Sequence, residues 1–294
     1  MDAFSQIFQY ILSGFSTGSI YALIGFGFAV IYNSTGIINF AQGEFVMLGG
    51  LLTVFLLNIT GLPLPAAIVS AIAITTLSGI VFERLAIRPL RNATPLNLVL
   101  ITIGASILIR GGAMLIWGKD THALPSFSGS DPIYIADATI LPQHLWIFAI
   151  TILIITANRL FFNRSITGKA MRACAYNREA AGLVGIDVKK MVLFSFVISS
   201  AIGSLAGIII APLTMSSYDV GVMLGLKGFC AAIIGGMSNG AGTVIGGLLL
   251  GILESLGAGF ISASYKDAIA FIILLLILFF RPEGIFRKDE TERV

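Results

Sequence analysis

Charged side chains are scarce in this sequence. Lys, Arg, Asp and Glu make up 11% of the 294 residues, against about 25% in an ordinary soluble domain. A soluble protein of this length needs more polar surface than so few charges supply, which excludes a cytosolic enzyme, a disordered chain and a nucleic-acid binder. The formal net charge of +3 is also too small to indicate a polyanionic partner.

The residues that build catalytic and metal sites are equally sparse. The two cysteines, Cys174 and Cys230, lie in a basic loop and an apolar segment, so no disulfide is expected. No cluster of His, Cys or carboxylate residues has metal-site spacing, and no nucleophile elbow or HExxH motif is present. The nearest approach to a P-loop is Gly168-Lys169, but Ala170 follows where Ser or Thr is required. We therefore expect a chain that is not an enzyme, holds no cofactor and leaves any ATP hydrolysis to separate chains.

Apolar residues, by contrast, are abundant. They make up 56% of the chain, and the mean hydropathy is +0.96. Nine runs approach the length of about 20 residues that a helix needs to cross a membrane: 7–31, 37–58, 63–82, 97–117, 145–162, 191–214, 220–237, 243–262 and 267–280. We predict an all-α, polytopic membrane helix bundle of about eight to ten transmembrane helices, with residues 1–294 forming one domain. The last three runs are short or rich in glycine, which favours broken or re-entrant segments there.

Glycine pairs spaced four residues apart recur within these runs. The chain has 33 glycines, and such pairs let membrane helices approach closely. The pairs are Gly14/Gly18, Gly203/Gly207, Gly242/Gly246 and Gly247/Gly251.

The basic residues are distributed unevenly along the chain. Three segments, 83–96, 159–190 and the tail after residue 280, hold 14 of the 18 Lys and Arg residues, and cytoplasmic loops are the basic ones. An odd number of spans satisfies every loop, so we predict an N-terminus outside the cell and a C-terminus inside. Residues 118–144 are then the only long extracytoplasmic loop, in which 131–137 is expected to form a short strand or an amphipathic turn.

The predicted cytoplasmic loop 159–190 contains two expected short helices. They cover 170–175 and 178–184, with a break at Tyr176-Asn177. Small residues at 180–182 would let a partner backbone come close. One interpretation is a docking helix that enters a cleft of a cytoplasmic partner; the other is a basic loop lying on anionic lipid. The segment by itself leaves both open.

Four stretches of the sequence carry a resemblance to a known family. Gly168–Asp187, with Glu179-Ala180-Ala181 and a following glycine, resembles the EAA loop, the coupling helix of ABC importer permeases. Three further stretches are similar to LivH-type permeases of branched-chain amino acid importers: Gly18–Glu44, Gly235–Glu254 and Tyr265–Gly284. Together the four stretches identify the chain as a member of that family over nearly its whole length.

The resemblance implies a division of labour among several proteins. A periplasmic substrate-binding protein would deliver a branched-chain or related neutral amino acid to a pore formed by this chain and a LivM-type permease. Two cytoplasmic ABC ATPases would bind ATP and Mg²⁺, and the assembly would lie in a bacterial inner membrane. Contacts that couple the chain to the ATPases are expected at Gly168, Arg172, Arg178, Glu179, Ala180, Ala181, Gly182 and Gly185.

Two departures from the family leave the substrate open. Gln42 stands where many members are expected to have His, and Arg110 stands where an uncharged residue is expected. Amides and urea therefore stay alternatives to branched-chain amino acids, and a homodimer stays an alternative to the heterodimer.

Polar residues within the predicted spans are the candidates for the translocation pathway. An ionisable residue that faces lipid costs at least about 2.5–3.5 kcal/mol at the helix centre. Asn39, Gln42 and Glu44 form a polar patch that is predicted to interrupt a helix and, together with Glu254, to lie beside the pathway or its gate. The alternative is a helix interface held by hydrogen bonds.

Two basic residues also fall within spans. Arg110 and Lys227 lie about 10 Å from the predicted outer boundary, and we expect both to snorkel to the surface. The alternative is that Arg110 pairs with Glu44 or Glu254 across the bundle.

Two other classes of function are compatible with the polar residues. An ion-coupled secondary transporter of small amphipathic solutes would use Glu44 or Glu254 as its coupling carboxylate and need no ATPase. A membrane-embedded enzyme or scaffold is the third class, and the lack of a catalytic cluster disfavours the enzyme.

Overall fold

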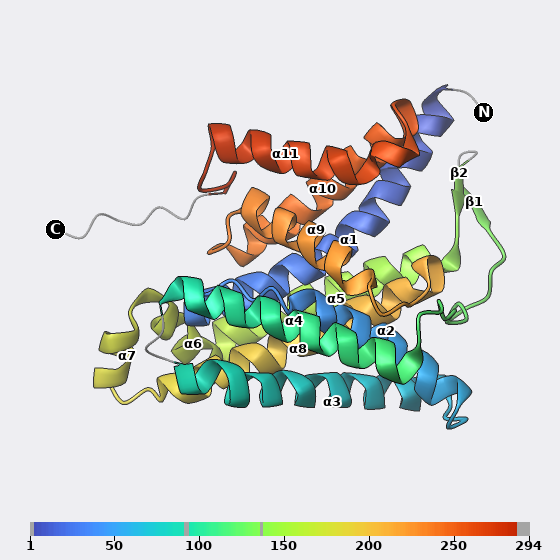
Figure 1. Ribbon diagram of the computed structural model, residues 1–294. Helices are drawn as coiled ribbons and strands as arrows, with labels where there is room; N and C mark the ends of the chain where they lie inside the picture. The colour runs from blue at the N-terminus through green and yellow to red at the C-terminus, as the bar shows by residue number, and fades with distance from the viewer. Residues whose placement is uncertain (1–2, 91–93, 136–137, 287–294) are drawn as a thin grey trace.

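The computed structural model describes residues 3–90, 94–135 and 138–286, and these residues are mostly helical. Nine of the described helices form the bundle: α1 (Ala3–Thr35), α2 (Gln42–Asn58), α3 (Leu64–Phe82), α4 (Pro95–Trp117), α5 (Pro142–Arg164), α8 (Val188–Thr214), α9 (Val220–Gly235), α10 (Gly240–Phe260) and α11 (Lys266–Phe280). Two short helices, α6 (Ile166–Tyr176) and α7 (Arg178–Leu183), lie between α5 and α8. A small antiparallel hairpin, β1 (Ile133–Ile135) and β2 (Ala138–Ile140), precedes α5 (Figure 1).

Each predicted apolar run overlaps one bundle helix, which confirms the polytopic helical fold. Seven apolar helical segments have at least 18 residues, enough to cross a membrane, while α2 and α9 have 17 and 16 residues. At 1.5 Å per residue these two helices span about 26 and 24 Å, less than the hydrocarbon core of about 30 Å. Helices α2 and α9 therefore begin or end inside the membrane-spanning part of the bundle.

Helices α2 and α9 each follow a non-helical segment. Residues 36–41 precede α2 and contain Asn39 of the predicted polar patch, so the predicted run 37–58 becomes helical only at Gln42. The other two residues of the patch, Gln42 and Glu44, lie in the first turn of α2. Residues 215–219 precede α9, and there Met215 has a φ of 61°. The break expected within the last three runs is wrong, because α9, α10 and α11 are each one continuous helix and residues 215–219 lie ahead of the run 220–237. Helix α10 is continuous despite its glycines, because these glycines pack against a neighbouring helix.

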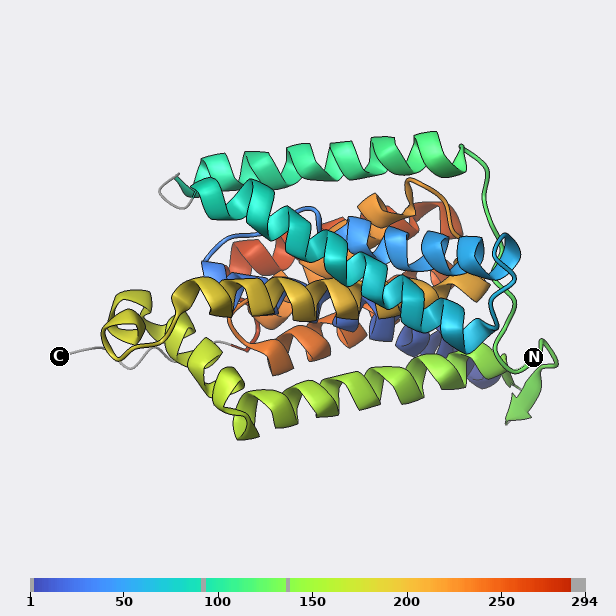
Figure 2. The ribbon, with the colours of Figure 1, turned by 90° about the horizontal axis from the view of Figure 1, so that it is seen from below.

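The small elements mark the two ends of the bundle. Helices α6 and α7 protrude at one end, and the β1–β2 hairpin lies at the other (Figures 1 and 2). Helix α1 begins at the hairpin end, and α11 ends at the α6–α7 end (Figure 1). This arrangement matches an odd number of crossings. That α6 and α7 face the cytoplasm stays a prediction of the charge distribution.

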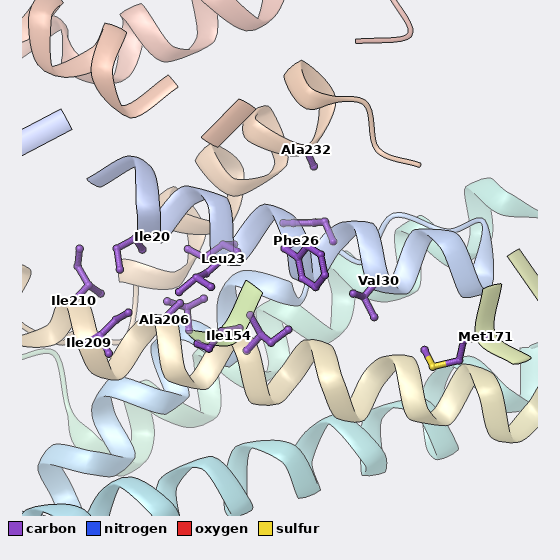
Figure 3. Close-up of a cluster of buried hydrophobic side chains, with 14 of the residues drawn as sticks. Ile20, Leu23, Phe26, Val30, Ile154, Met171, Ala206, Ile209, Ile210 and Ala232 are labelled. Atoms are coloured by element: carbon purple, nitrogen blue, oxygen red, sulfur yellow. The ribbon is translucent and has the colours of Figure 1, made fainter. Parts of the chain in front are cut away.

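The centre of the bundle is α1, which packs against α10 with almost no side chain between them. A Cβ on Gly18 would lie 2.9 Å from the carbonyl oxygen of Gly247, and one on Gly14 would lie 2.7 Å from the Cα of Ile252. These distances are too short for any side chain, so the predicted glycine pairs do bring helices together. The opposite side of α1 contributes to the hydrophobic core with α5, α6 and α8 (Figure 3).

Candidate functional site

The segment before α2, which contains Asn39 of the polar patch, forms a turn rather than a helix. The carboxamide oxygen of Asn39 accepts a hydrogen bond from the Ala41 N–H at 3.1 Å, which fixes the turn locally. The N–H of Phe40 donates to the hydroxyl of Thr102 on α4 at 3.1 Å. The side chains of Asn39 and Thr102 are both buried. A side chain from a neighbouring helix thus replaces one of the helical hydrogen bonds that the break removes.

Gln42 joins α2 to α8 and α1. Its amide nitrogen donates to the Ser199 carbonyl at 3.2 Å, and its amide oxygen lies 2.6 Å from the Ser199 hydroxyl. The same hydroxyl lies 2.9 Å from the carbonyl oxygen of Gly27. Because a Cβ at Gly27 would collide with the Gln42 amide, the glycine makes room for this contact. Gln42 therefore acts in this structure as a buried link between three helices.

Glu44 faces α4 from the first turn of α2. Its Oε1 accepts a hydrogen bond from the Ser106 hydroxyl at 2.7 Å, whereas its buried Oε2 has no partner among the described residues. The guanidinium of Arg110 attracts the Glu44 carboxylate electrostatically. No ion pair within 4.0 Å joins Arg110 to a carboxylate in the part of the chain that the structure describes.

These contacts define one polar face on a helix that is otherwise apolar. Thr102, Ser106 and Arg110 are spaced four residues apart on α4, which places them on the same side of the helix. We call this set, together with Asn39 and Glu44, the α2–α4 polar face. Sequence reasoning missed Thr102 and Ser106. Their spacing from Arg110 was the signal that could have found them.

Glu254 lies elsewhere, in an ion-pair cluster between α1, α9, α10 and α11. Its Oε1 is 2.7 Å from Lys227 Nζ and 3.5 Å from Lys266 Nζ, and accepts a hydrogen bond from the Tyr21 hydroxyl at 3.2 Å. Lys227 also pairs with Asp267 at 2.6 Å. Among the described residues, no hydrogen bond or ion pair connects this cluster to Glu44.

The expected snorkelling of Lys227 is wrong. The residue is only 5% exposed and is held by two carboxylates from two other helices. Its ammonium group also lies 5.6 Å from the centre of the Tyr21 ring. Its charge is therefore compensated by neighbouring carboxylates of this chain.

The segment between α5 and α8 has the two helices that the sequence predicts, although α6 begins earlier than expected. Asn177 separates them, and its side chain caps α7 by accepting from the Ala180 N–H at 3.0 Å. Arg178 donates to the carbonyl oxygen of Ser34 at 2.7 Å, which ties α7 to the end of α1. The α6–α7 unit is therefore anchored to the central helix of the bundle.

The predicted coupling residues divide into two groups. Gly168 and Ala181 are buried and pack within the chain. The others are exposed: Arg172, Arg178, Glu179, Ala180, Gly182 and Gly185. Leu183 and Val184, which sequence reasoning did not single out, are 89% and 77% exposed at the end of α7. Two such apolar side chains at a protruding tip favour contact with another protein.

Comparisons with known proteins give a consistent result. Residues 10–278 match the model of the family described as the permease component of branched-chain amino acid transport systems. The chain is 35% identical to the high-affinity branched-chain amino acid transport system permease protein LivH of Escherichia coli K12, over 100% of this chain and 99% of that protein. It is 34% identical to the permease protein BraD of Pseudomonas aeruginosa, over 97% of each chain.

Less similar proteins also match the chain. The chain is 30% identical to an autoinducer 2 import system permease, LsrC, of an Enterobacter species, over 90% of this chain and 76% of that protein. Among solved structures, PsaBC from Streptococcus pneumoniae in complex with Fab covers 94% of each chain with a TM-score of 0.50 and 12% sequence identity.

Proposed function

The chain belongs to the family of permease components of branched-chain amino acid ABC transport systems and is a multi-pass bacterial membrane protein, and from this premise we propose its place in a complete importer. It forms the translocation pore together with a related LivM-type subunit. Two cytoplasmic ATPases drive it, and a periplasmic binding protein supplies a branched-chain or related neutral amino acid. ATP hydrolysis, with its Mg²⁺, belongs to the ATPase chains.

The exposed tip of α7 is the observation that supports coupling to the ATPases. It combines the apolar side chains of Leu183 and Val184 with the charge of Glu179, and Asn177 fixes its direction. The hydrogen bond from Arg178 to the end of α1 connects this tip to the bundle. Closure of the ATPases can shift the bundle through this connection only if they bind α7 differently in the two states.

The α2–α4 polar face is our proposed location for the pathway. Helix α4 is largely uncovered by the rest of the chain, because only 11% of its most apolar 18-residue stretch is buried. Arg110 on this helix would pay the cost of a charge in lipid unless protein or water lies beside it. Because Glu44 and Thr102 are already buried between α2 and α4, a pathway here would open as these two helices separate, which would expose the carboxylate of Glu44 to a zwitterionic solute. A second permease subunit on the uncovered side of α4 would shield that path from lipid.

The test is co-purification from mild detergent followed by an ATPase assay in proteoliposomes. ATPase subunits should co-purify with the tagged chain, and their turnover should rise when the binding protein is loaded with substrate. Glu179→Arg should abolish this stimulation. Glu283→Arg makes the same change of charge at an exposed position after α11, at the same end of the bundle but outside α6 and α7, and it should leave stimulation intact.

The contrary result is also informative. Uptake that persists without any ATPase, and that Glu179→Arg does not alter, would refute the coupling role of α7. Such uptake would favour ion-coupled transport through Glu44.

A further inference from the structure

A cavity of about 570 Å³ lies beside α6. Four helices form its walls, and it is separate from the α2–α4 polar face. Its apolar lining comes from Phe26 and Val30 of α1, Ile155 and Phe162 of α5, and Val244 and Ile245 of α10. A cavity of this size with apolar walls suits a hydrocarbon chain better than a hydrated ion.

The charged residues that line the cavity are both arginines. Arg159 projects from α5 and Arg172 from α6, and no carboxylate side chain appears among the lining residues. Arg172 donates to the carboxamide oxygen of Asn163 at 3.2 Å, which holds it at the rim. Because both guanidinium groups are exposed and have no carboxylate partner within 4.0 Å among the described residues, the rim attracts anions.

The position of the arginines corresponds to the level of lipid headgroups. Arg159 lies five residues before the end of α5, or about 7.5 Å along the helix axis. Helix α6 has the residue pattern of an interfacial helix, with Met171 and Cys174 buried and Lys169 and Arg172 exposed. The guanidinium groups therefore sit where the polar and apolar regions of a leaflet meet.

We propose that this cavity binds one phospholipid with an anionic headgroup. The phosphate lies between Arg159 and Arg172, and an acyl chain covers the apolar wall of α1, α5 and α10. Basic pockets between membrane helices are suited to such headgroups. A neutral amino acid fits less well, because its ammonium group would find two cations and no carboxylate in the lining.

The experiment is native mass spectrometry of the full chain in detergent, titrated with dioleoylphosphatidylglycerol. We expect one tightly bound lipid per chain. The double variant Arg159→Gln/Arg172→Gln should weaken its affinity by about 25-fold, at roughly fivefold for each positive charge. The matched control, Arg164→Gln/Lys169→Gln, removes two exposed charges of the same region that do not line the cavity, and should change the affinity less than twofold.

Further measurements test the apolar cavity and the charge of the headgroup separately. Ala241→Trp fills the cavity from α10 but keeps both arginines, and should also abolish tight lipid binding. Dioleoylphosphatidylcholine should bind at least tenfold more weakly than phosphatidylglycerol, and soluble glycerol phosphate should not compete at equal concentration.

Three results would overturn the proposal: equal loss of affinity in the control pair, equal affinity for the two lipids, or competition by glycerol phosphate. Because no ATPase or transport is measured, failure of this proposal is distinguishable from failure of the coupling role of α7. Thermal unfolding of each variant identifies a misfolded protein, and Ala241→Trp then provides the independent test.

Discussion

The ion-pair cluster around Glu254 should be a major source of stability, and Lys227→Met tests it. The change removes the cation 2.7 Å from a carboxylate that is fully buried. Lys266 at 3.5 Å and the Tyr21 hydroxyl at 3.2 Å are then the only described groups left against Glu254. Breaking a buried ion pair by removing one partner costs about 3–5 kcal/mol, because the other charge stays buried. We expect a loss of this size in the free energy of unfolding.

The assay is unfolding of the purified chain in mixed micelles by titration with sodium dodecyl sulfate. Lys190→Met is the matched control, since its ion pair with Asp187 is 3.5 Å long and exposed to solvent. Exposed pairs contribute about 0–1 kcal/mol, so the control should change little. The double variant Lys227→Met/Glu254→Leu should recover much of the lost stability, because no uncompensated charge is left in the interior.

Two results would refute the reasoning. If Lys227→Met costs no more than Lys190→Met, the cluster does not stabilise the fold. If the double variant is as unstable as the two single changes added together, the cost comes from lost packing and not from the unpaired charge.

Three further predictions concern other parts of the chain. Glu44→Gln should lower substrate uptake by proteoliposomes of the complete importer about 10-fold or more, because it removes a charged acceptor whose hydrogen bonds are worth about 1.5–3 kcal/mol. The control Glu283→Gln, outside the bundle helices, should have little effect on uptake. An equal loss of uptake in both variants would contradict a pathway role for Glu44. Asn177→Ala should weaken α7 by about 1 kcal/mol, seen as faster hydrogen exchange at residues 178–183, whereas Asn177→Ser should retain the cap. Burial raises the pKa of the Cys174 thiol, so less thiolate is present at a given pH; alkylation at pH 7 should be slow until the protein unfolds, and rapid modification of the native chain would contradict its burial.

Much of the fold could be predicted from local patterns in the sequence. The nine apolar runs, the break before α2 and the paired helices after α5 follow from patterns within short windows of sequence. The polar patch at Asn39 and Gln42 was visible because hydrophilic residues inside a long apolar run are costly. Local signals of this kind do not depend on which helix lies next to which.

The contacts between distant segments could not be predicted. Lys227 is 27 residues from Glu254 in sequence and 40 from Asp267, and only the packing of α9 against α10 and α11 brings them together. A lysine near the end of a span looks the same in sequence whether it snorkels or pairs. Ser106 was missed for the same reason, since its partner Glu44 lies on another helix.

The glycine contact between α1 and α10 has a mechanical consequence. Two backbones that touch without intervening side chains cannot slide past one another by changing rotamers, so α1 and α10 form a single stiff beam across the membrane. The same kind of contact joins α2 to α8 and α9, because a Cβ on Gly207 would meet the carbonyl of Val46 and one on Gly43 would meet the carbonyl of Gly221. In a transport cycle α2, α8 and α9 would therefore move together with this beam as one frame, and the helices that it contacts only through side chains would be the parts that shift against it.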